Sequence, residues 1–276
     1  MTSLIGQDPA VVRQRLCRHL VRLRGDRSQQ GVADALAWSR SKVIRIESGS
    51  IGISTADLRA LLELYQVRNP ATVELLVHMA RESRRQVGSP YADVLSPELA
   101  FYLRYEASAL RLRQYHPNLV PGLLQTEEYA EAVITAFAGA DASRDIIKRQ
   151  VAARMARQAV LRGRVRAHFV LDEAALRRDL GDHLMRRQLA HLAEVARRPN
   201  VTVQLLPFAA GLLGGAQWPF VLLDFPGAEG DTETLLYLEG RSTSVIRDDP
   251  AELARHQLAF DELSAAASPI GAAGVL

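Results

Sequence analysis

The sequence predicts a mainly α N-terminal domain of five helices, followed by an α+β domain with a small sheet. In the first third, apolar residues recur at helical spacing between polar caps and glycines, without a strand pattern. Beyond Arg164, short apolar and β-branched runs bounded by Pro, Gly and acidic residues predict strands. A segment rich in breakers near Gly88 separates the two. We therefore expect domains at residues 1–85 and 101–276, joined by a linker at 86–100.

Composition is typical of a globular protein. Of the 276 residues, 48% are hydrophobic, which is enough to build packed cores. Cys17 is the only cysteine, which excludes a disulfide framework and a cysteine-based zinc site and favours a reducing compartment. The first ten residues lack the pattern of a signal peptide, and no apolar run approaches 18 residues. We expect a cytoplasmic protein that has no membrane segment, metal or cofactor.

Charge is distributed unevenly along the chain. Residues 1–88 contain 14 Lys and Arg against 8 Asp and Glu, a net charge of +6, while the remainder contains 20 against 23, a net charge of −3. A basic first third attached to a slightly acidic body is typical of a small nucleic-acid-binding module on a larger domain. Because 32 of the 34 basic residues are Arg, the position of the charges is better evidence than their number.

Caps and apolar spacing predict the first three helices. An apolar stripe of Val12, Leu16, Leu20 and Leu23 predicts a helix that ends at Gly25. Ser28 is a suitable cap for a second helix over Gln29–Leu36, and Ser39 for a third over Arg40–Ser48. Ala37 and Trp38 form the turn between these two helices, and Gly49 ends the third.

Two further helices complete the predicted bundle. The stretch from Ser54 to Asp57 resembles a capping box, and the apolar residues after it are Leu58, Leu61, Leu62 and Tyr65. The fifth helix begins at Asn69-Pro70, with Pro at the first helical position, and its apolar residues are Val73, Leu76 and Met79.

The second domain changes from helical to mixed patterns along its length. Residues 96–115, 125–138 and 142–162 are predicted helices, and helices also fill 173–198 and 250–266. The predicted strands are residues 165–171, 201–206, 220–225 and 234–238.

Residues 28–50 have the features of a helix-turn-helix that contacts DNA. On the third helix, Val43, Ile46 and Glu47 share one face, and the opposite face carries Arg40, Ser41, Ile44 and Arg45. Arg can make a bidentate contact to guanine, and Ile44 can contact a thymine methyl group. Phosphate contacts are expected where helices begin and at a nearby basic residue. The residues expected to contact phosphate are Ser28, Gln29, Ser39, Lys42 and Ser50.

The stretches Ser28–Ala33 and Trp38–Gly49 resemble the Xre or phage-repressor class of helix-turn-helix proteins. The resemblance implies a lambda-repressor-like fold in which Arg40, Ser41 and Arg45 contact bases and Gln29 holds a phosphate. It also implies that Arg22 pairs with Glu47, joining the first helix to the third. Ala37 departs from the pattern because it replaces the usual turn glycine.

Residues 101–265 resemble the C-terminal domain of the Scr1-type, WhiJ-like antitoxin-like regulators of actinobacteria, a domain of the DUF5753 type. The resemblance implies that the chain is encoded beside a small acidic partner protein, which the C-terminal domain binds, and it assigns no catalytic residue. The segments that carry it are Tyr105–Ala107, Val120–Thr126, Tyr129-Ala130, Ala153-Arg154, Arg157-Gln158, Leu171–Arg178 and Tyr237–Glu239.

No residue pattern predicts an enzyme. The sequence has no Gly-x-Ser-x-Gly elbow, His-Glu-x-x-His pair or Walker-type loop. Three other groups of residues favour structural roles over chemical ones. Gly211, Gly214 and Gly215 are interpreted as a connection between strands. His183 and His191 are interpreted as solvated or capping histidines, and Asp172 with Glu173 as a helix cap.

One basic run in the second domain has several interpretations. Its residues are Arg144, Lys148, Arg149, Arg154, Arg157, Arg162, Arg164 and Arg166. It is a charged, solvated helix face, an extension of the DNA contact, or a site for an acidic partner.

These patterns together indicate a sequence-specific, homodimeric regulator that binds double-stranded DNA and is modulated through its C-terminal domain. Three alternatives stay open at this point: a helical bundle that binds no DNA, an antitoxin-like protein whose main role is to bind and neutralise a partner, and a small-molecule-sensing repressor. Dimerisation is expected because one bundle of this size makes few base contacts.

Overall fold

The computed structural model describes residues 7–84, 88, 90–139, 142–227, 231–240 and 244–270. It divides into two compact units, Met1–Gly88 with Pro226–Glu233, and Ser89–Phe225 with Thr234–Leu276. Residues 86, 87 and 89 of the predicted linker lie outside the described residues, and the first helix after it begins at Pro97. No helix in the described ranges is long and apolar enough to cross a membrane.

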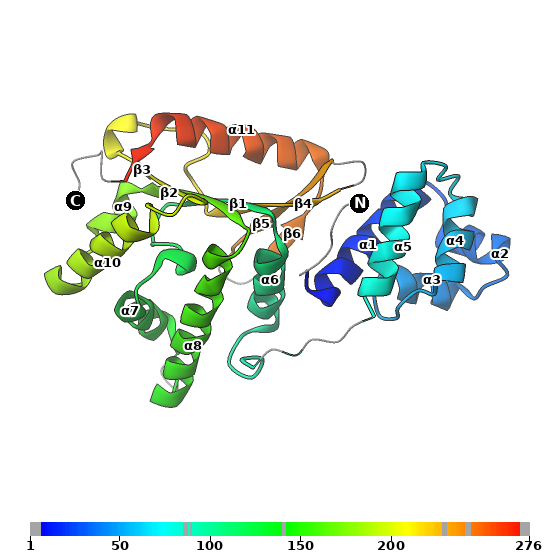
Figure 1. Cartoon of the computed structure of the whole chain (residues 1–276), viewed down its shortest axis with the longest axis horizontal. Coiled ribbons are helices and arrows are strands. Elements are labelled where there is room, and N and C mark those ends of the chain that lie inside the picture. The colour runs from blue at the N-terminus through cyan, green and yellow to red at the C-terminus, as the bar shows by residue number, and fades with distance from the viewer. Residues whose placement is uncertain are drawn as a thin grey trace. The chain divides into compact units, whose positions relative to one another are not determined.

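The helices described in the first unit are α1 (Pro9–Arg24), α2 (Gln29–Ala35), α3 (Arg40–Glu47), α4 (Thr55–Leu64) and α5 (Pro70–Glu82) (Figure 1). Each begins at a side chain that accepts a hydrogen bond from a backbone N–H of the first turn. These capping residues are Asp8, Ser28, Ser39, Ser54 and Asn69. The predicted five-helix bundle is confirmed, with its helix starts within a residue or two of those expected.

Apolar residues from all five helices form one core. Leu16 and Leu20 of α1 pack with Val43 and Ile46 of α3, and Leu58 of α4 belongs to the same cluster. Cys17 is buried beside this core, and its Sγ donates to the carbonyl of Ile46 at 3.2 Å. Burial raises the pKa of the Cys17 thiol to about 11, so it stays protonated and acts in packing.

The second unit contains a mixed sheet of seven strands in the described residues, in the order β6-β5-β4-β1-β2-β3-β7. The three strands β1, β2 and β3 are parallel neighbours, whereas β4 pairs antiparallel with β1. The strands are β1 (Arg111–His116), β2 (Arg166–Asp172), β3 (Val201–Leu206), β4 (Phe220–Pro226), β5 (Thr232–Leu238), β6 (Val245–Arg247) and β7 (Ser268–Pro269).

Helices cover both faces of this sheet (Figure 1). On one face lies α11 (Pro250–Ala266), whose Phe260 and Leu263 pack on Phe220 and Leu222 of β4. The helices on the other face are α6 (Pro97–Ser108), α7 (Glu127–Phe137), α8 (Arg144–Arg157), α9 (Glu173–Arg177) and α10 (Asp182–Val195). Short 3-10 turns lie at Gly122–Leu124, Gln158–Arg162 and Phe208–Ala210. The predicted α+β domain is confirmed.

The prediction of one helix over residues 96–115 is wrong at its second half. Residues Arg111–His116 form β1, which lies in the middle of the sheet between β4 and β2. The sequence Arg-Leu-Arg-Gln-Tyr-His has too few apolar residues to look like a buried strand. Arg113 is buried in this strand because it has a partner, in its ion pair with Asp224 at 3.2 Å.

Two structural interpretations from the sequence are confirmed by the second unit. Asp172 caps α9, since its Oδ1 accepts a hydrogen bond from the N–H of Ala174 at 2.8 Å. The glycines at 211, 214 and 215 lie in the connection between β3 and β4. Gly211 has φ +73°, a backbone conformation that favours glycine.

Candidate nucleic-acid interface

The turn between α2 and α3 fixes the angle of the candidate DNA-contacting helix. After α2, Ala37 adopts φ +54°, and the N–H of Trp38 donates to the carbonyl of Ala33 at 2.8 Å. This is the hydrogen bond that closes a Schellman motif. Glycine normally occupies the left-handed position of that motif because its lack of a Cβ removes the steric cost.

We therefore expect Ala37→Gly to stabilise the first unit by about 1 kcal/mol, because it removes the left-handed strain of alanine. Urea unfolding followed by Trp38 fluorescence, in a Trp218→Phe background, measures the change. Ala60→Gly is the matched control, since Ala60 lies in the middle of α4, where the same substitution is expected to cost about 1 kcal/mol. A loss of stability in Ala37→Gly comparable to that of the control would contradict the argument.

The two faces of α3 are separated as the sequence predicts. Val43 and Ile46 are buried in the core, whereas Arg40, Ser41 and Arg45 are exposed. Ile44 is 40% exposed, although it is a large apolar side chain and other apolar residues of the same helix are buried in the core. Ile44 thus lies on the exposed face of α3, with Arg40, Ser41 and Arg45.

The predicted phosphate-contacting serines lie at helix starts and at a turn. Ser28 and Ser39 cap α2 and α3, accepting hydrogen bonds from the N–H groups of Gly31 at 3.0 Å and Lys42 at 3.2 Å. Ser50 follows α3, and its Oγ lies 2.7 Å from the Oγ of Ser48. All three are exposed, and helix starts carry partial positive charge that favours anions.

Lys42 is held by contacts within the bundle. Its Nζ lies 3.0 Å from Oδ1 of Asp57 in α4 and 3.8 Å from the centroid of the Trp38 ring. Both contacts fix the side chain at the edge of the exposed face of α3, and about a third of it is exposed. The predicted phosphate contact of Lys42 therefore competes with an ion pair to Asp57, because one ammonium group serves both.

Glu47 joins three helices. The Nε of Arg24 donates to Glu47 Oε1 at 2.7 Å, and the pairing of Arg22 with Glu47 that the resemblance implies stays a prediction. Arg24 is four residues after the buried Leu20 and continues its row on α1. Arg22 is exposed on another side of α1. Spacing from the apolar stripe is the signal in the sequence that identifies Arg24.

Gln29 makes the second contact of Glu47. Its Nε2 donates to Glu47 Oε2 at 2.7 Å, so the side chain at the start of α2 is tied to the end of α3. This contact was not anticipated from the sequence, because it depends on how the two helices pack. It orients α2 relative to α3, and the phosphate contact of Gln29 stays a prediction.

Comparison with known families gives two matches. Residues 15–76 match the model of a helix-turn-helix domain family. Residues 99–273 match the model of the family described as domain of unknown function DUF5753. The first match covers α2, α3, α4 and parts of α1 and α5, and the second covers almost all of the sheet unit. No curated protein and no solved structure matches the chain.

Proposed function

The chain belongs to the DUF5753 family and carries a helix-turn-helix domain ahead of that region, and on this premise we propose that it is a sequence-specific DNA-binding transcriptional regulator. A helix-turn-helix domain suggests DNA binding. The single observation that supports specific binding most is the exposed face of α3, where Arg40, Ser41, Ile44 and Arg45 stand together outside the core. We assign base contacts to these four residues.

The phosphate contacts of the proposal are Ser28, Gln29, Ser39, Lys42 and Ser50, which flank the base-contacting face. They lie at the starts of α2 and α3, on the first turn of α3, and just after it. Contacts of this kind fix the register of a protein on the duplex without selecting a sequence.

We expect Lys42→Gln to weaken DNA binding without changing sequence preference. If Lys42 neutralises one phosphate, the slope of log K against log[salt] becomes shallower by about 0.9. Titrations of the full chain with its selected site and with unrelated DNA, at several salt concentrations, measure both quantities. Lys148→Gln is the matched control, because Lys148 is the other lysine and is exposed on α8 of the second unit. An unchanged slope in Lys42→Gln would mean that Lys42 stays with Asp57.

We also propose that the regulator acts as a homodimer. Two copies would place their α3 helices in successive major grooves, about 34 Å apart along the duplex. Selection of binding sites from random DNA tests this directly. The expected site has two inverted half-sites with centres about 10 base pairs apart, whereas a single unrepeated site would refute the dimer.

Modulation by a small acidic partner protein is the next element of the proposal, and the surface of the second unit supports it. Most of the basic run at 144–166 is exposed, namely Arg144, Lys148, Arg149, Arg162, Arg164 and Arg166. Such a surface suits an acidic partner. The chain is expected to copurify with the product of an adjacent small acidic reading frame. Charge reversal at Arg162 and Arg164 is expected to disrupt that complex if the partner binds this basic surface.

A second candidate function, a small-molecule-sensing regulator, is favoured by a cavity in the sheet unit. The cavity has a volume of about 690 Å³, within the range of ligand pockets in proteins. An antitoxin-like role and this sensing role differ in what the second unit binds. A partner protein that copurifies favours the first, and a metabolite that stabilises the chain without a partner favours the second.

A further inference from the structure

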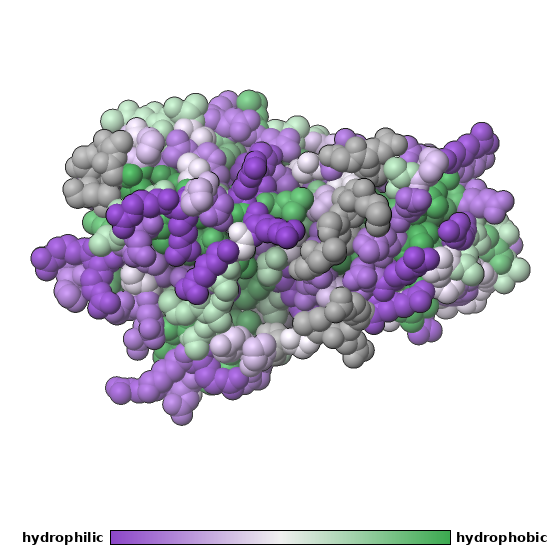
Figure 2. All heavy atoms as spheres, viewed as in Figure 1, coloured by the Kyte–Doolittle hydropathy of each residue, from purple (hydrophilic) through white to green (hydrophobic). Residues whose placement is uncertain are grey.

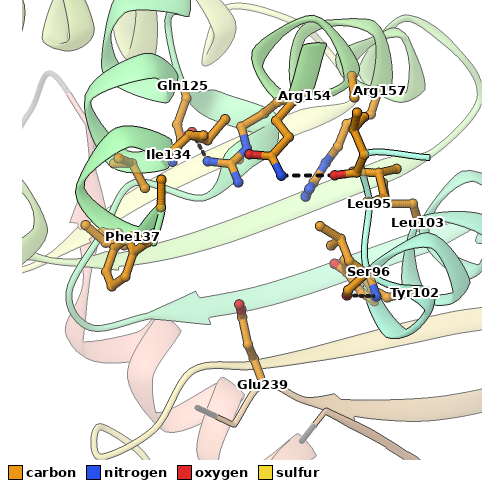
Figure 3. A pocket seen from close by; sticks show the side chains of 18 of the residues that line it. Leu95, Ser96, Tyr102, Leu103, Gln125, Ile134, Phe137, Arg154, Arg157 and Glu239 are labelled. Atoms are coloured by element: carbon orange, nitrogen blue, oxygen red, sulfur yellow. Dashed lines mark hydrogen bonds between the residues drawn. The ribbon is translucent and has the colours of Figure 1, made fainter. Parts of the chain in front are cut away.

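The cavity of the second unit is bounded by α6, α7 and α8 and by the middle strand β1 (Figure 3). Much of its wall is apolar, contributed by Leu95, Leu99, Leu103, Val133, Ile134 and Phe137. Figure 2 shows apolar residues exposed on this face between α8 and α6. Phe137 is 76% exposed and Ile134 is buried, so the apolar lining runs from the surface inward. An occupant with an apolar body would bury this lining from water.

Arg154 places a positive charge inside this apolar space. Its guanidinium points from α8 toward the middle of the cavity (Figure 3). Among the described residues, its one hydrogen bond goes from Nη1 to Oε1 of Gln125 at 3.0 Å, which leaves donors of the guanidinium facing the cavity. Burial and the neighbouring Arg157 lower the pKa of Arg154 to about 10, against an opposite effect of Glu239. At neutral pH the guanidinium is charged, so this part of the cavity favours an anion, while the exposed carboxylate of Glu239 lines another part of it (Figure 3).

Arg157, one helical turn away, is already neutralised. Its Nη2 donates at 3.0 Å to Oε2 of Glu106, a residue with no exposed surface, and the hydroxyl of Tyr102 donates to the same oxygen. The pair removes one positive charge from the cavity. Arg154, which is half-buried, is then the arginine of the described lining that has no hydrogen-bonded carboxylate. A ligand with one carboxylate fits this guanidinium.

Gln114, on the floor of the cavity, is a second and independent observation that points to a ligand. The side chain is only 6% exposed, it lines the cavity, and its Oε1 has no hydrogen-bond partner. A buried amide oxygen without a hydrogen-bond donor destabilises the fold. A ligand that donates a hydrogen bond at this position would remove that cost.

Hydrogen bonds from two other glutamines hold the segment 122–125, which contacts Arg154. Gln158 donates from Nε2 to the carbonyls of Gly122 and Gln125, and Gln188 donates to the carbonyl of Leu124. Gln125, held by these bonds, accepts the hydrogen bond of Arg154. The guanidinium is thus oriented before any ligand arrives, which lowers the entropic cost of binding.

We propose that this cavity binds a small organic acid, with its one carboxylate on Arg154, its apolar body among the side chains of α6 and α7, and a hydroxyl or similar donor at Gln114. The binding itself does not depend on DNA. Its regulatory meaning rests on the proposed function.

Calorimetric titration of the full chain with 3-hydroxydecanoate, decanoate and decanol tests each part of the proposal. Decanoate is expected to bind at least tenfold more tightly than decanol, because only the acid pairs with Arg154. The hydroxyl of 3-hydroxydecanoate is expected to add about two- to tenfold, and Gln114→Leu to abolish that gain. Equal affinity for decanoate and decanol, or no binding of any probe below about 1 mM, would overturn the proposal.

Variants separate recognition from folding. Arg154→Gln is expected to lower decanoate affinity at least tenfold and to leave decanol affinity unchanged, whereas Arg144→Gln, exposed on the same helix, changes neither. Phe137→Ala alters an exposed side chain and is expected to weaken both probes about equally. Circular dichroism shows whether each variant is folded. If Arg154→Gln is folded and binds decanoate normally, the carboxylate is not on Arg154.

Titration with the selected DNA site distinguishes failure of this proposal from failure of the regulator. Saturating decanoate is expected to change the Kd for that site by about fivefold or more, in line with ordinary allosteric coupling. A chain that binds acid but no specific DNA refutes the regulator and leaves the cavity assignment standing. A chain that binds its DNA site but none of the acids refutes the cavity assignment alone.

Discussion

Replacing Arg40 and Arg45 together with alanine is expected to weaken binding to the selected DNA site by about 30-fold to 10⁴-fold. Each bidentate contact of arginine to guanine contributes about 1–3 kcal/mol of discrimination, so two contribute about 2–6 kcal/mol. The affinity for unrelated DNA is expected to fall much less, because that affinity depends on charge alone. The ratio of the two affinities is therefore the informative quantity.

The fold of the first unit should tolerate this double substitution. Both arginines are exposed on α3, and within the described residues neither side chain makes a hydrogen bond or ion pair. Alanine is the strongest helix former, so α3 keeps its helical preference. Loss of binding can then be attributed to the missing side chains, provided that thermal unfolding of the variant matches that of the unsubstituted chain.

A charge-matched control isolates the contribution of position. Arg68→Ala with Arg81→Ala removes two positive charges from the same unit, outside α2 and α3. This control is expected to lower affinity for all DNA similarly and to keep the preference for the selected site. If the control and the Arg40/Arg45 variant lose specificity equally, the base contacts do not lie on α3.

The sequence predicted the face of α3 because that face depends on local rules. Caps at Ser28 and Ser39 set the helix starts, and a period of 3.6 residues then decides which side chains share a side. The partner of Glu47 could not be assigned by resemblance alone, since Arg22 and Arg24 differ only in their direction around α1. Arg24 follows the buried Leu20 by four residues on α1, and it pairs with Glu47.

The cavity was not predicted, because its residues come together only through packing of distant segments. In the sequence, Arg154 and Arg157 look like part of a charged helix face, as Arg144 and Arg149 are in the structure. Whether an arginine on a helix is solvated or buried depends on the element that packs against it, here the segment around Gly122 and Gln125. The one sign of this site in the sequence is that the segments around Gln125, Arg154 and Arg157 are among those in which the second domain resembles its family.

The ion pair between Arg157 and Glu106 leads to the second large expected effect. Arg157→Met is expected to destabilise the second unit by about 3–5 kcal/mol at neutral pH, because it leaves the fully buried Glu106 carboxylate without a cation. Urea unfolding followed by amide hydrogen exchange in the α6 and β1 peptides measures the change. This measurement reports on the second unit alone, because the α6 and β1 peptides belong to that unit.

Two variants check the origin of the loss. Arg149→Met removes an arginine from the same helix, but its ion pair with Asp93 is half-exposed, so it should cost less than about 1 kcal/mol. Glu106→Met combined with Arg157→Met removes both charges and should recover much of the stability, because no buried charge is left unpaired. If the double variant is no more stable than Arg157→Met alone, the loss comes from packing and not from charge.

The pH dependence of Arg157→Met supplies the sharpest test. In the unsubstituted chain burial raises the pKa of Glu106, and the Arg157 charge and the Tyr102 hydroxyl oppose that rise. Without Arg157 the pKa of Glu106 in the folded state rises further above its unfolded value. A raised pKa favours the folded state below the unfolded pKa, and that contribution is lost as pH rises through the folded pKa.

The deficit of Arg157→Met in free energy of unfolding, relative to the unsubstituted chain, should therefore be largest at neutral pH. It should shrink as the pH is lowered toward the ordinary range of glutamate. A deficit that stays constant between about pH 5 and 8 would show that Glu106 is not the group that loses its partner.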